Sequence, residues 1–188
     1  MLVLGLTGKI GCGKDTVSRY LEREHGFRSI SMGDIVREYV REEGLEMTRE
    51  NQQKIGTGYR EKHGKDFFAR EVARKIGELP GDRFVINGVR APHDVKVPRK
   101  RFDEKFCLIQ ITSPAEDRFQ RMKGRSRPGD PETFEEFKEQ EESDIEKFNQ
   151  DETFEMADYE IKNDGSLDEL FEKVGRLIDK LEEDVEED

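Results

Sequence analysis

Cysteine and histidine are scarce in this chain of 188 residues, and long apolar runs are missing from it. The two cysteines, Cys12 and Cys107, are too few and too far apart for a disulfide framework or a zinc site. The three histidines show no metal-ligand spacing either. Because no run of about 18 residues is apolar, the sequence predicts no membrane-spanning helix. The apolar start, residues 1–6, is too short for a signal peptide, so we expect a cytoplasmic protein.

Acidic residues outnumber basic ones, 44 to 33, and give the chain a formal net charge of −11. Such a protein is repelled by the phosphates of nucleic acids and by anionic membranes, so we expect neither as a partner. Hydrophobic residues make up only 32% of the sequence, yet they are concentrated in a few segments. A disordered chain lacks such segments, and the sequence therefore predicts a folded, heavily charged protein.

Short apolar segments alternate with amphipathic ones along the chain. The first kind predicts strands at residues 3–6, 27–31, 83–87, 105–112 and 157–162. The second kind predicts helices from residue 13, over 33–43, 48–62 and about 68–79, from 114, over about 134–148, and from 166 onward. This alternation is typical of an α/β fold in which helices cover both faces of a parallel sheet. We expect one domain over residues 1–188 with five strands in its core.

The strongest motif is a glycine-rich run between the first strand and the first helix. It reads Gly8-Lys9-Ile10-Gly11-Cys12-Gly13-Lys14-Asp15-Thr16 and fits the template G-x-x-x-x-G-K-[ST], except at Asp15. The glycines let backbone N–H groups surround phosphates, the helix N-terminus adds positive partial charge, and Lys14 adds a point charge. We therefore predict that the loop binds ATP with Mg²⁺, and that Asp15 or Thr16 holds the ion directly or through water. A glycine-rich turn without a ligand is the alternative interpretation.

With three later segments, this motif resembles the adenylate-kinase-like group of nucleoside monophosphate kinases over nearly all of residues 1–180. The likeness includes an archaeal set of adenylate-kinase-related proteins that are labelled dephospho-CoA-kinase-like. The run Ser31-Met32-Gly33-Asp34-Ile35-Val36-Arg37 is similar to the family's acceptor motif S-T-G-D-x-x-R. The resemblance implies that Ser31 and Arg37 contact the acceptor and that Asp34 lies beside the transfer site. The same residues are also typical of a simple helix cap.

The next segment of the resemblance follows the strand at 83–87. The run Val85-Ile86-Asn87-Gly88-Val89-Arg90 is similar to the family's apolar strand that ends in D-G-x-R or D-G-x-x-R. The resemblance implies that Gly88 and Arg90 bind the acceptor, with Arg90 on its phosphate. Asn87 replaces an aspartate that steadies magnesium through water, and Asp15 is the candidate to supply the missing charge. A turn and helix cap at 88–94 is the alternative.

Basic residues gather ahead of a proline-containing loop. They are Arg118, Arg121, Lys123, Arg125 and Arg127. They resemble the lid of these kinases, here at 125–133, and imply that Arg121 binds ATP and that Arg121 and Arg125 act on the transferring phosphate. The family's second lid segment carries further arginines, whereas half of residues 134–143 are acidic here and none is arginine. An exposed basic helix face is the alternative.

The last segment of the resemblance covers residues 157–166. It resembles the strand and turn that pack against adenine, which implies that Asn163 and Gly165 contact ATP. A capped loop between a strand and a helix is the alternative.

Taken together, the resemblance implies transfer of the γ-phosphate of ATP to a small phosphate-bearing acceptor, in the first place a nucleoside monophosphate. The acceptor would bind a helical insertion at 32–80. Lys14, Arg90, Arg121 and Arg125 would surround the phosphoryl group, and Asp34 is the candidate to orient an attacking hydroxyl. Two other functions stay open: transfer to a ribose hydroxyl, as by a dephospho-CoA kinase, and an ATP-switched assembly factor with weak ATPase activity. The acceptor, the base preference and the oligomeric state are not predicted.

Overall fold

A parallel sheet of five strands lies at the centre of the computed structural model, which describes residues 1–125 and 130–186. Its order is β2-β3-β1-β4-β5. The strands are β1 (Leu2–Thr7), β2 (Arg28–Ser31), β3 (Arg83–Asn87), β4 (Phe106–Thr112) and β5 (Tyr159–Lys162). The helices are α1 (Lys14–Glu24), α2 (Met32–Glu42), α3 (Arg49–His63), α4 (Phe67–Glu78), α5 (Pro92–Phe102), η1 (Asp103–Lys105), α6 (Ala115–Arg125), α7 (Phe134–Phe148), α8 (Gln150–Glu155) and α9 (Leu167–Glu186). The predicted five-stranded parallel α/β fold is confirmed.

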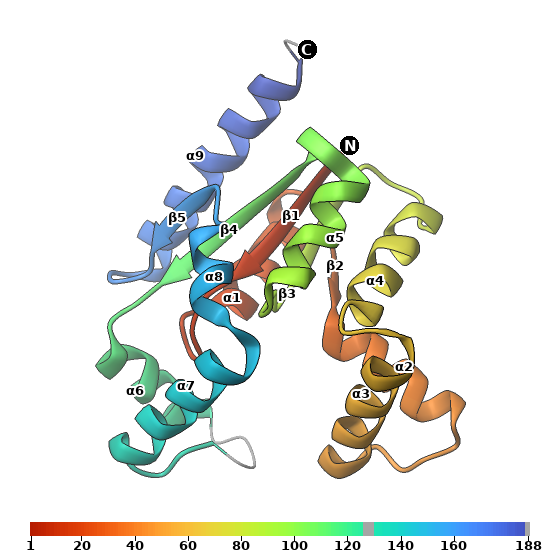
Figure 1. Cartoon of the computed structure of the whole chain (residues 1–188). Helices are drawn as coiled ribbons and strands as arrows, with labels where there is room; N and C mark the ends of the chain where they lie inside the picture. The colour runs from red at the N-terminus through yellow and green to blue at the C-terminus, as the bar shows by residue number, and fades with distance from the viewer. Residues whose placement is uncertain (126–129, 187–188) are drawn as a thin grey trace.

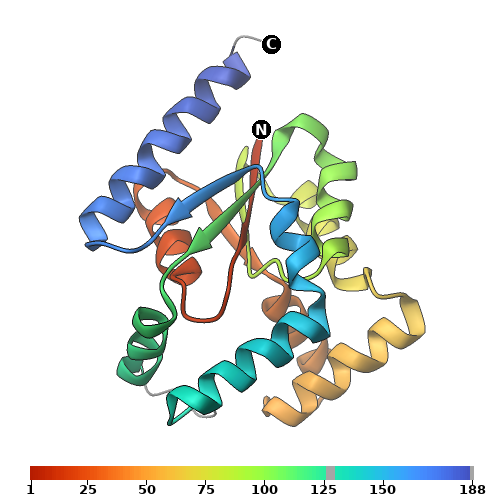
Figure 2. The same cartoon turned by 60° about the vertical axis from the view of Figure 1, so that its left-hand side comes forward.

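Apolar side chains alternate between the two faces of the sheet, and each face has its own core. On one face Val3, Phe84 and Leu108 pack with residues of α2, α4 and α5. On the other face Leu4 and Ile109 pack with residues of α1 and α9. Figures 1 and 2 show these helices on opposite sides of the strands. Strand β1, whose six residues are all buried, pairs with β3 and β4 at the middle of the sheet.

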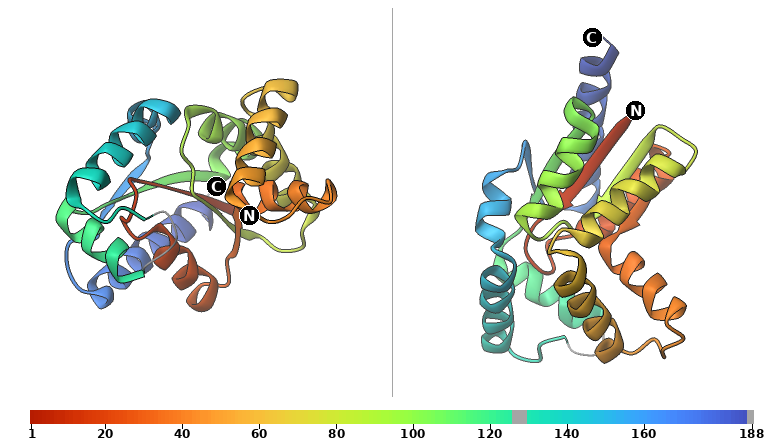
Figure 3. Two further views of the ribbon diagram at one scale, coloured as in Figure 1. Left: turned by 90° about the horizontal axis from the view of Figure 1, so that it is seen from below. Right: turned by 45° about the vertical axis from the view of Figure 1, so that its right-hand side comes forward.

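All five strands end at the same edge of the sheet because all pairs are parallel. The glycine-rich loop follows β1 at this edge, between the ends of β3 and β4. Helices α2 and α3 lie to one side of the loop, and α6 and α7 lie to the other (Figures 1 and 3). Ligands of open parallel sheets bind outside this carboxyl edge, so the fold itself indicates where a site lies.

Two α-helices of the described residues, and the short 3-10 helix η1, are absent from the sequence predictions. Helix α5 carries Pro98 in its interior, which breaks the pattern of a continuous helix, although Pro92 and Asp94 form a regular first turn. Helix α8 has only six residues, too few to show a period. The predicted strand bounds differ from those of the structure by at most two residues. None of the helices described is long and apolar enough to cross a membrane.

Candidate active site

The glycine-rich loop is held in a conformation that other residues adopt with difficulty. Gly8, Gly11 and Gly13 have φ angles of 138°, 77° and 108°. A Cβ at Gly8 would lie 2.2 Å from the carbonyl oxygen of Ile111, and one at Gly13 would lie 2.5 Å from Nδ2 of Asn163. Glycine is therefore required here both by backbone conformation and by close approach of neighbouring groups.

The ammonium of Lys14 lies over the loop. Its Nζ donates to the carbonyl oxygens of Gly8 at 2.6 Å and Lys9 at 3.0 Å. In the described part of the chain, the N–H groups of Gly11, Gly13 and Lys14 donate to no other protein group. Helix α1 also begins at Lys14, so its positive end faces the loop. The loop thus gathers N–H groups, a helix terminus and a cation, which together suit a polyphosphate.

Asp15 and Asn87 form a pair beside the loop. Nδ2 of Asn87 donates to Oδ1 of Asp15 at 2.9 Å. Oδ1 of Asn87 is buried, and within the described residues it has no hydrogen-bond partner. A carboxylate beside an unsatisfied amide oxygen fits Mg²⁺, which prefers oxygen ligands and completes its shell with water and substrate phosphates. The residues that the structure describes contain no cluster of three or more His, Cys, Asp or Glu side chains that could hold a metal ion through protein groups alone.

Asp34 has a structural role at the beginning of α2. Its N–H donates to Oγ of Ser31 at 3.0 Å, and its carboxylate accepts from the N–H of Ser31 at 3.1 Å and pairs with Arg37. Burial alone would raise the pKa of Asp34, but hydrogen bonds from Ser31 and Arg37 bring it below its ordinary value of 3.8. The helix-cap interpretation is therefore confirmed, and the acceptor-binding role stays a prediction. Arg37 thus pairs with Asp34, whereas Arg90 lies over the ring of Phe148.

Beside Asp34 lies a hollow of about 380 Å³ at the outer edge of β2. It is lined by Arg28, Ser29, Ile30, Asp34, Arg37, Glu38, Arg41, Lys75 and Leu79. Lys75 is paired with Glu38 across this hollow.

The segment after β3 is fixed against the beginning of the glycine-rich loop. Oγ1 of Thr7, the last residue of β1, donates to the carbonyl oxygen of Val89 at 2.9 Å. Gly88 has a φ of 83°, which turns the chain sharply after the strand. The guanidinium of Arg90 lies 5.4 Å from the ring centre of Phe148. The backbone before Arg90 thus lies beside the end of β1, and the acceptor-binding role of Arg90 stays a prediction.

A second arginine, Arg60 on α3, lies near Arg90. It lies 4.8 Å from the ring centre of Phe68 and donates to the carbonyl oxygen of Gly56 at 2.9 Å. Burial, in the first place, and the positive charge of Arg90 lower the pKa of Arg60, against the opposite effect of Asp94. The sequence did not indicate Arg60, because nothing in a polar helix marks one basic residue as inward-facing.

Arg121 and Asn163 meet beside the loop. The guanidinium of Arg121 donates to Oγ of Ser113 at 2.9 Å and to the carbonyl oxygen of Asn163 at 3.2 Å. Nδ2 of Asn163 in turn donates to the carbonyl oxygen of Cys12 at 2.9 Å. Gly165 follows in the turn between β5 and α9. The structure therefore brings two predicted ATP contacts, Arg121 and Asn163, against the glycine-rich loop.

Arg125 and Arg118 both lie on α6 but differ in their surroundings. Arg125 donates two hydrogen bonds to the carboxylate of Asp130, at 2.7 and 2.8 Å, and these bonds, followed by the charge of Asp15, raise its pKa. Arg118 is buried, with only 4% of its side chain exposed, so it does not belong to an exposed basic face. Residues 126–129 of the predicted lid, which include Arg127, lie outside the described residues.

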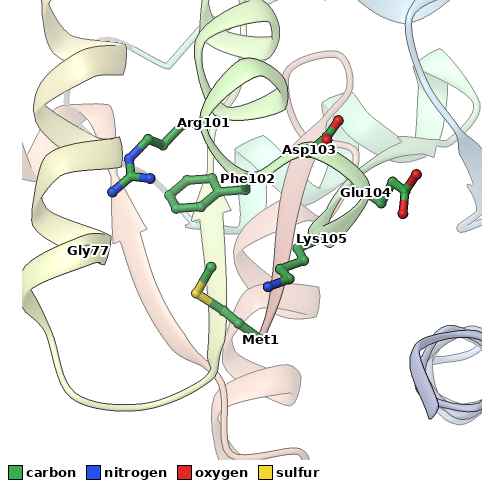
Figure 4. A pocket seen from close by; sticks show the side chains of 7 residues that line it. All are labelled: Met1, Gly77, Arg101, Phe102, Asp103, Glu104 and Lys105. Atoms are coloured by element: carbon green, nitrogen blue, oxygen red, sulfur yellow. The ribbon is translucent and has the colours of Figure 1, made fainter. Parts of the chain in front are cut away.

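A larger hollow, of about 530 Å³, lies at the other end of the sheet, where β1 and β4 begin (Figure 4). It is lined by Met1, Gly77, Arg101, Phe102, Asp103, Glu104 and Lys105. None of the residues that the sequence indicates for catalysis or binding is among them. The carboxyl edge of the sheet thus carries the candidate site.

Comparison with known sequences gives the family of the chain. The model of the AAA domain family matches residues 4–154 and so includes the glycine-rich loop. The UPF0200 protein of Methanothermobacter thermautotrophicus is 35% identical over 187 residues, which cover 100% of this chain and 94% of that relative. The chain belongs to the UPF0200 family. The UPF0200 protein of Thermococcus kodakarensis is 34% identical, with 96% of this chain and 98% of that relative covered.

One UPF0200 relative is longer. The UPF0200/UPF0201 protein of Archaeoglobus fulgidus is 37% identical over 99% of this chain, but the match covers only 58% of that relative. This chain thus spans little more than half of the Archaeoglobus protein.

Solved structures show the fold of this UPF0200 chain. TT1252 from Thermus thermophilus aligns with a TM-score of 0.65 and 19% identity, over 96% of this chain and 97% of that one. The shikimate kinase of Bacteroides thetaiotaomicron aligns with a TM-score of 0.61 and 15% identity, over 96% and 98%. At these identities the likeness concerns the fold alone, which is that of P-loop kinases.

Proposed function

We propose that the protein transfers the γ-phosphate of ATP to a small acceptor that itself carries a phosphate group. The fold and the loop support nucleotide-dependent phosphotransfer. The observation that carries the acceptor class is the electrostatic interaction of Arg60, which is partly buried on α3, with Arg90, which follows the turn after β3. Within the described residues neither forms an ion pair with a carboxylate. Asp94 attracts Arg60 more strongly than Arg90 repels it. One carboxylate against two guanidinium groups still leaves net positive charge, which suits an anion with several oxygens.

Different residues of the site bind ATP, its magnesium ion and the acceptor. The loop N–H groups and Lys14 hold the β- and γ-phosphates of ATP, and Asp15, Thr16 and Asn87 hold its magnesium ion. The ion supplies positive charge to the phosphate oxygens when it is bound. Arg60 and Arg90 hold the acceptor in line with the γ-phosphate. Catalysis then consists of positioning and charge stabilisation, because phosphoryl transfer needs little covalent chemistry from a protein.

Arg121 and Arg125 approach the γ-phosphate from α6. Arg121 is already beside the loop, through its contact with Asn163. Arg125 is held by Asp130, and it reaches the phosphate only when a phosphate oxygen replaces that carboxylate. We therefore assign Arg121 to nucleotide binding and Arg125 to the transition state.

The engagement of Asp34 favours a phosphate acceptor over a hydroxyl acceptor. A phosphate oxygen is already ionised at neutral pH and needs no general base, whereas a ribose hydroxyl benefits from one. Asp34 is the candidate base, but its carboxylate is occupied by Ser31 and Arg37, and its pKa lies below 3.8. A nucleoside monophosphate therefore fits better than the ribose hydroxyl of dephospho-CoA.

The acceptor class is tested by coupled ADP release against a panel of nucleoside monophosphates and dephospho-CoA. Arg60→Ala and Arg90→Ala should raise the KM for the acceptor at least tenfold with little change in ATP affinity, as expected for groups that bind one substrate. Arg176→Ala on α9, whose side chain is 72% exposed, is the matched control and should behave as wild type. Dephospho-CoA accepted alone, or an unchanged acceptor KM in both variants, would overturn the assignment.

A nucleotide-driven switch is the second candidate function. It is favoured by the Asp15 and Asn87 departures and by the Archaeoglobus relative, in which a further segment accompanies the matched part. A switch would hydrolyse ATP slowly, and a small acceptor would not accelerate ADP release. The panel assay separates the two functions.

A further inference from the structure

Arg118 connects the tip of the glycine-rich loop to the helices beyond β4. Its Nη1 donates to the carbonyl oxygen of Ile10 at 3.1 Å, and its Nε donates to that of Ser113 at 2.9 Å. The guanidinium also lies 5.2 Å from the ring centre of Phe137 on α7. Only 4% of the side chain is exposed, so these contacts hold it in one position.

The charge of Arg118 is balanced by Glu141, which lies on α7. One carboxylate oxygen of Glu141 pairs with Arg118, and the other accepts from Nζ of Lys9 at 3.2 Å. Glu141 is itself 14% exposed. A single carboxylate thus binds a residue of the loop and the residue that holds the loop's tip. Ile10 packs against the apolar cluster of α6 and α7, which contains Phe137.

These contacts decide where the loop's N–H groups point. In a trans peptide the C=O and the N–H of the next residue point in opposite directions. Because the carbonyl of Ile10 is turned toward Arg118, the N–H of Gly11 points away from Arg118. In the same way Asn163 holds the carbonyl of Cys12, and the N–H of Gly13 points away from Asn163. Two side chains outside the loop therefore orient the two peptides that suit a phosphate.

We propose that Glu141 is a positioning residue for phosphate binding, acting through Arg118. A buried guanidinium without its carboxylate is strongly disfavoured and turns toward water. It then releases the carbonyl of Ile10, and the N–H of Gly11 loses its fixed direction. The acidic helix α7 lies where the resemblance implies arginines. Glu141 is one of its acidic residues, and the proposal assigns it the role of holding Arg118. The proposal rests on the proposed binding of nucleotide by the loop.

The test compares Glu141→Gln with Glu139→Gln, which removes an exposed charge from the same helix. Fluorescence titration measures the affinities of mant-labelled ADP, which reaches the loop, and mant-labelled adenosine, which lacks phosphates. We expect Glu141→Gln to weaken ADP binding about tenfold and to leave adenosine binding within twofold of wild type. Glu139→Gln should match wild type for both. A general loss of structure would instead weaken both ligands together.

A second variant covers the case in which Glu141→Gln does not fold. The double change Arg118→Met with Glu141→Leu replaces the pair by apolar side chains of similar size, which is often neutral or stabilising. It should also weaken ADP binding about tenfold, because the carbonyl of Ile10 has lost its donor. ADP affinity within twofold of wild type in this variant, or an equal loss for adenosine, overturns the proposal. A wild-type protein that binds no ADP overturns the proposed function, and this proposal with it.

Discussion

Replacing Gly8 by alanine tests the geometry of the glycine-rich loop directly. The new Cβ would lie 2.2 Å from the carbonyl oxygen of Ile111 and 2.8 Å from Sγ of Cys12. The oxygen belongs to the backbone of β4, which is paired on both sides, and cannot rotate away, so the loop must shift, at a cost of about 1–3 kcal/mol. The φ of 138° adds backbone strain of about 1–3 kcal/mol for a residue other than glycine. We expect a total loss of roughly 2–6 kcal/mol, a large part of the stability of about 5–15 kcal/mol typical of a domain.

Gly26→Ala is the matched control for this substitution. Gly26 also has a positive φ, 69°, but no atom lies within 4 Å of the position of its Cβ. Only the cost of the left-handed conformation remains, about 1–2 kcal/mol. Urea unfolding followed by circular dichroism gives both values, provided that the slope m is unchanged. A Gly8→Ala protein that is as stable as Gly26→Ala would refute the close packing of the loop against β4.

Three further predictions concern ionisable groups. Asp34→Asn should cost about 1 kcal/mol as a lost cap. Because the pKa of Asp34 is lowered, the loss is present at pH 7 and diminishes as the pH falls from 3.8 through the folded pKa, and equal losses in urea titrations at pH 7 and pH 3 would contradict this. Arg125→Ala should lower kcat more than ATP affinity, whereas a change in affinity alone would make Arg125 a ground-state clamp. Burial, with a smaller effect of Asp158, raises the pKa of Cys107 to about 12, so this thiol should react with Ellman's reagent at pH 8 only after unfolding, and rapid reaction in the native protein would contradict its burial.

The strands and the loop were predictable because their signals are local. The inner strands β1, β3 and β4 are short, largely apolar runs, and the loop combines a fixed glycine spacing with a strand before it and a helix after it. Helix α5 was not predictable in the same way, since Pro98 lies inside it and contributes no N–H. The cap formed by Ser31 and Asp34 was one of two interpretations of the same motif, and the structure shows the cap.

The remaining parts of the site depend on contacts between distant segments. Arg60 approaches Arg90 across 30 positions of the chain, and Glu141 reaches Lys9 across 132. No local pattern encodes such pairs, because they follow from how helices pack on the sheet. The burial of Arg118 was not predictable from the local sequence either. Arg118 resembles its neighbours on α6 in the sequence, yet the rotation of the helix turns it into the protein, where it contacts the loop.

Lys14→Ala, assayed as ADP release from ATP and Mg²⁺ with and without a phosphate-bearing acceptor, tests the central claim most directly. The account predicts that wild-type protein releases ADP faster when the acceptor is present. It also predicts that the variant loses about 2–4 kcal/mol of transition-state stabilisation, a rate loss of roughly 30- to 1000-fold. Undiminished turnover by Lys14→Ala, or wild-type ADP release that no acceptor accelerates, would contradict the assignment of a P-loop phosphotransferase.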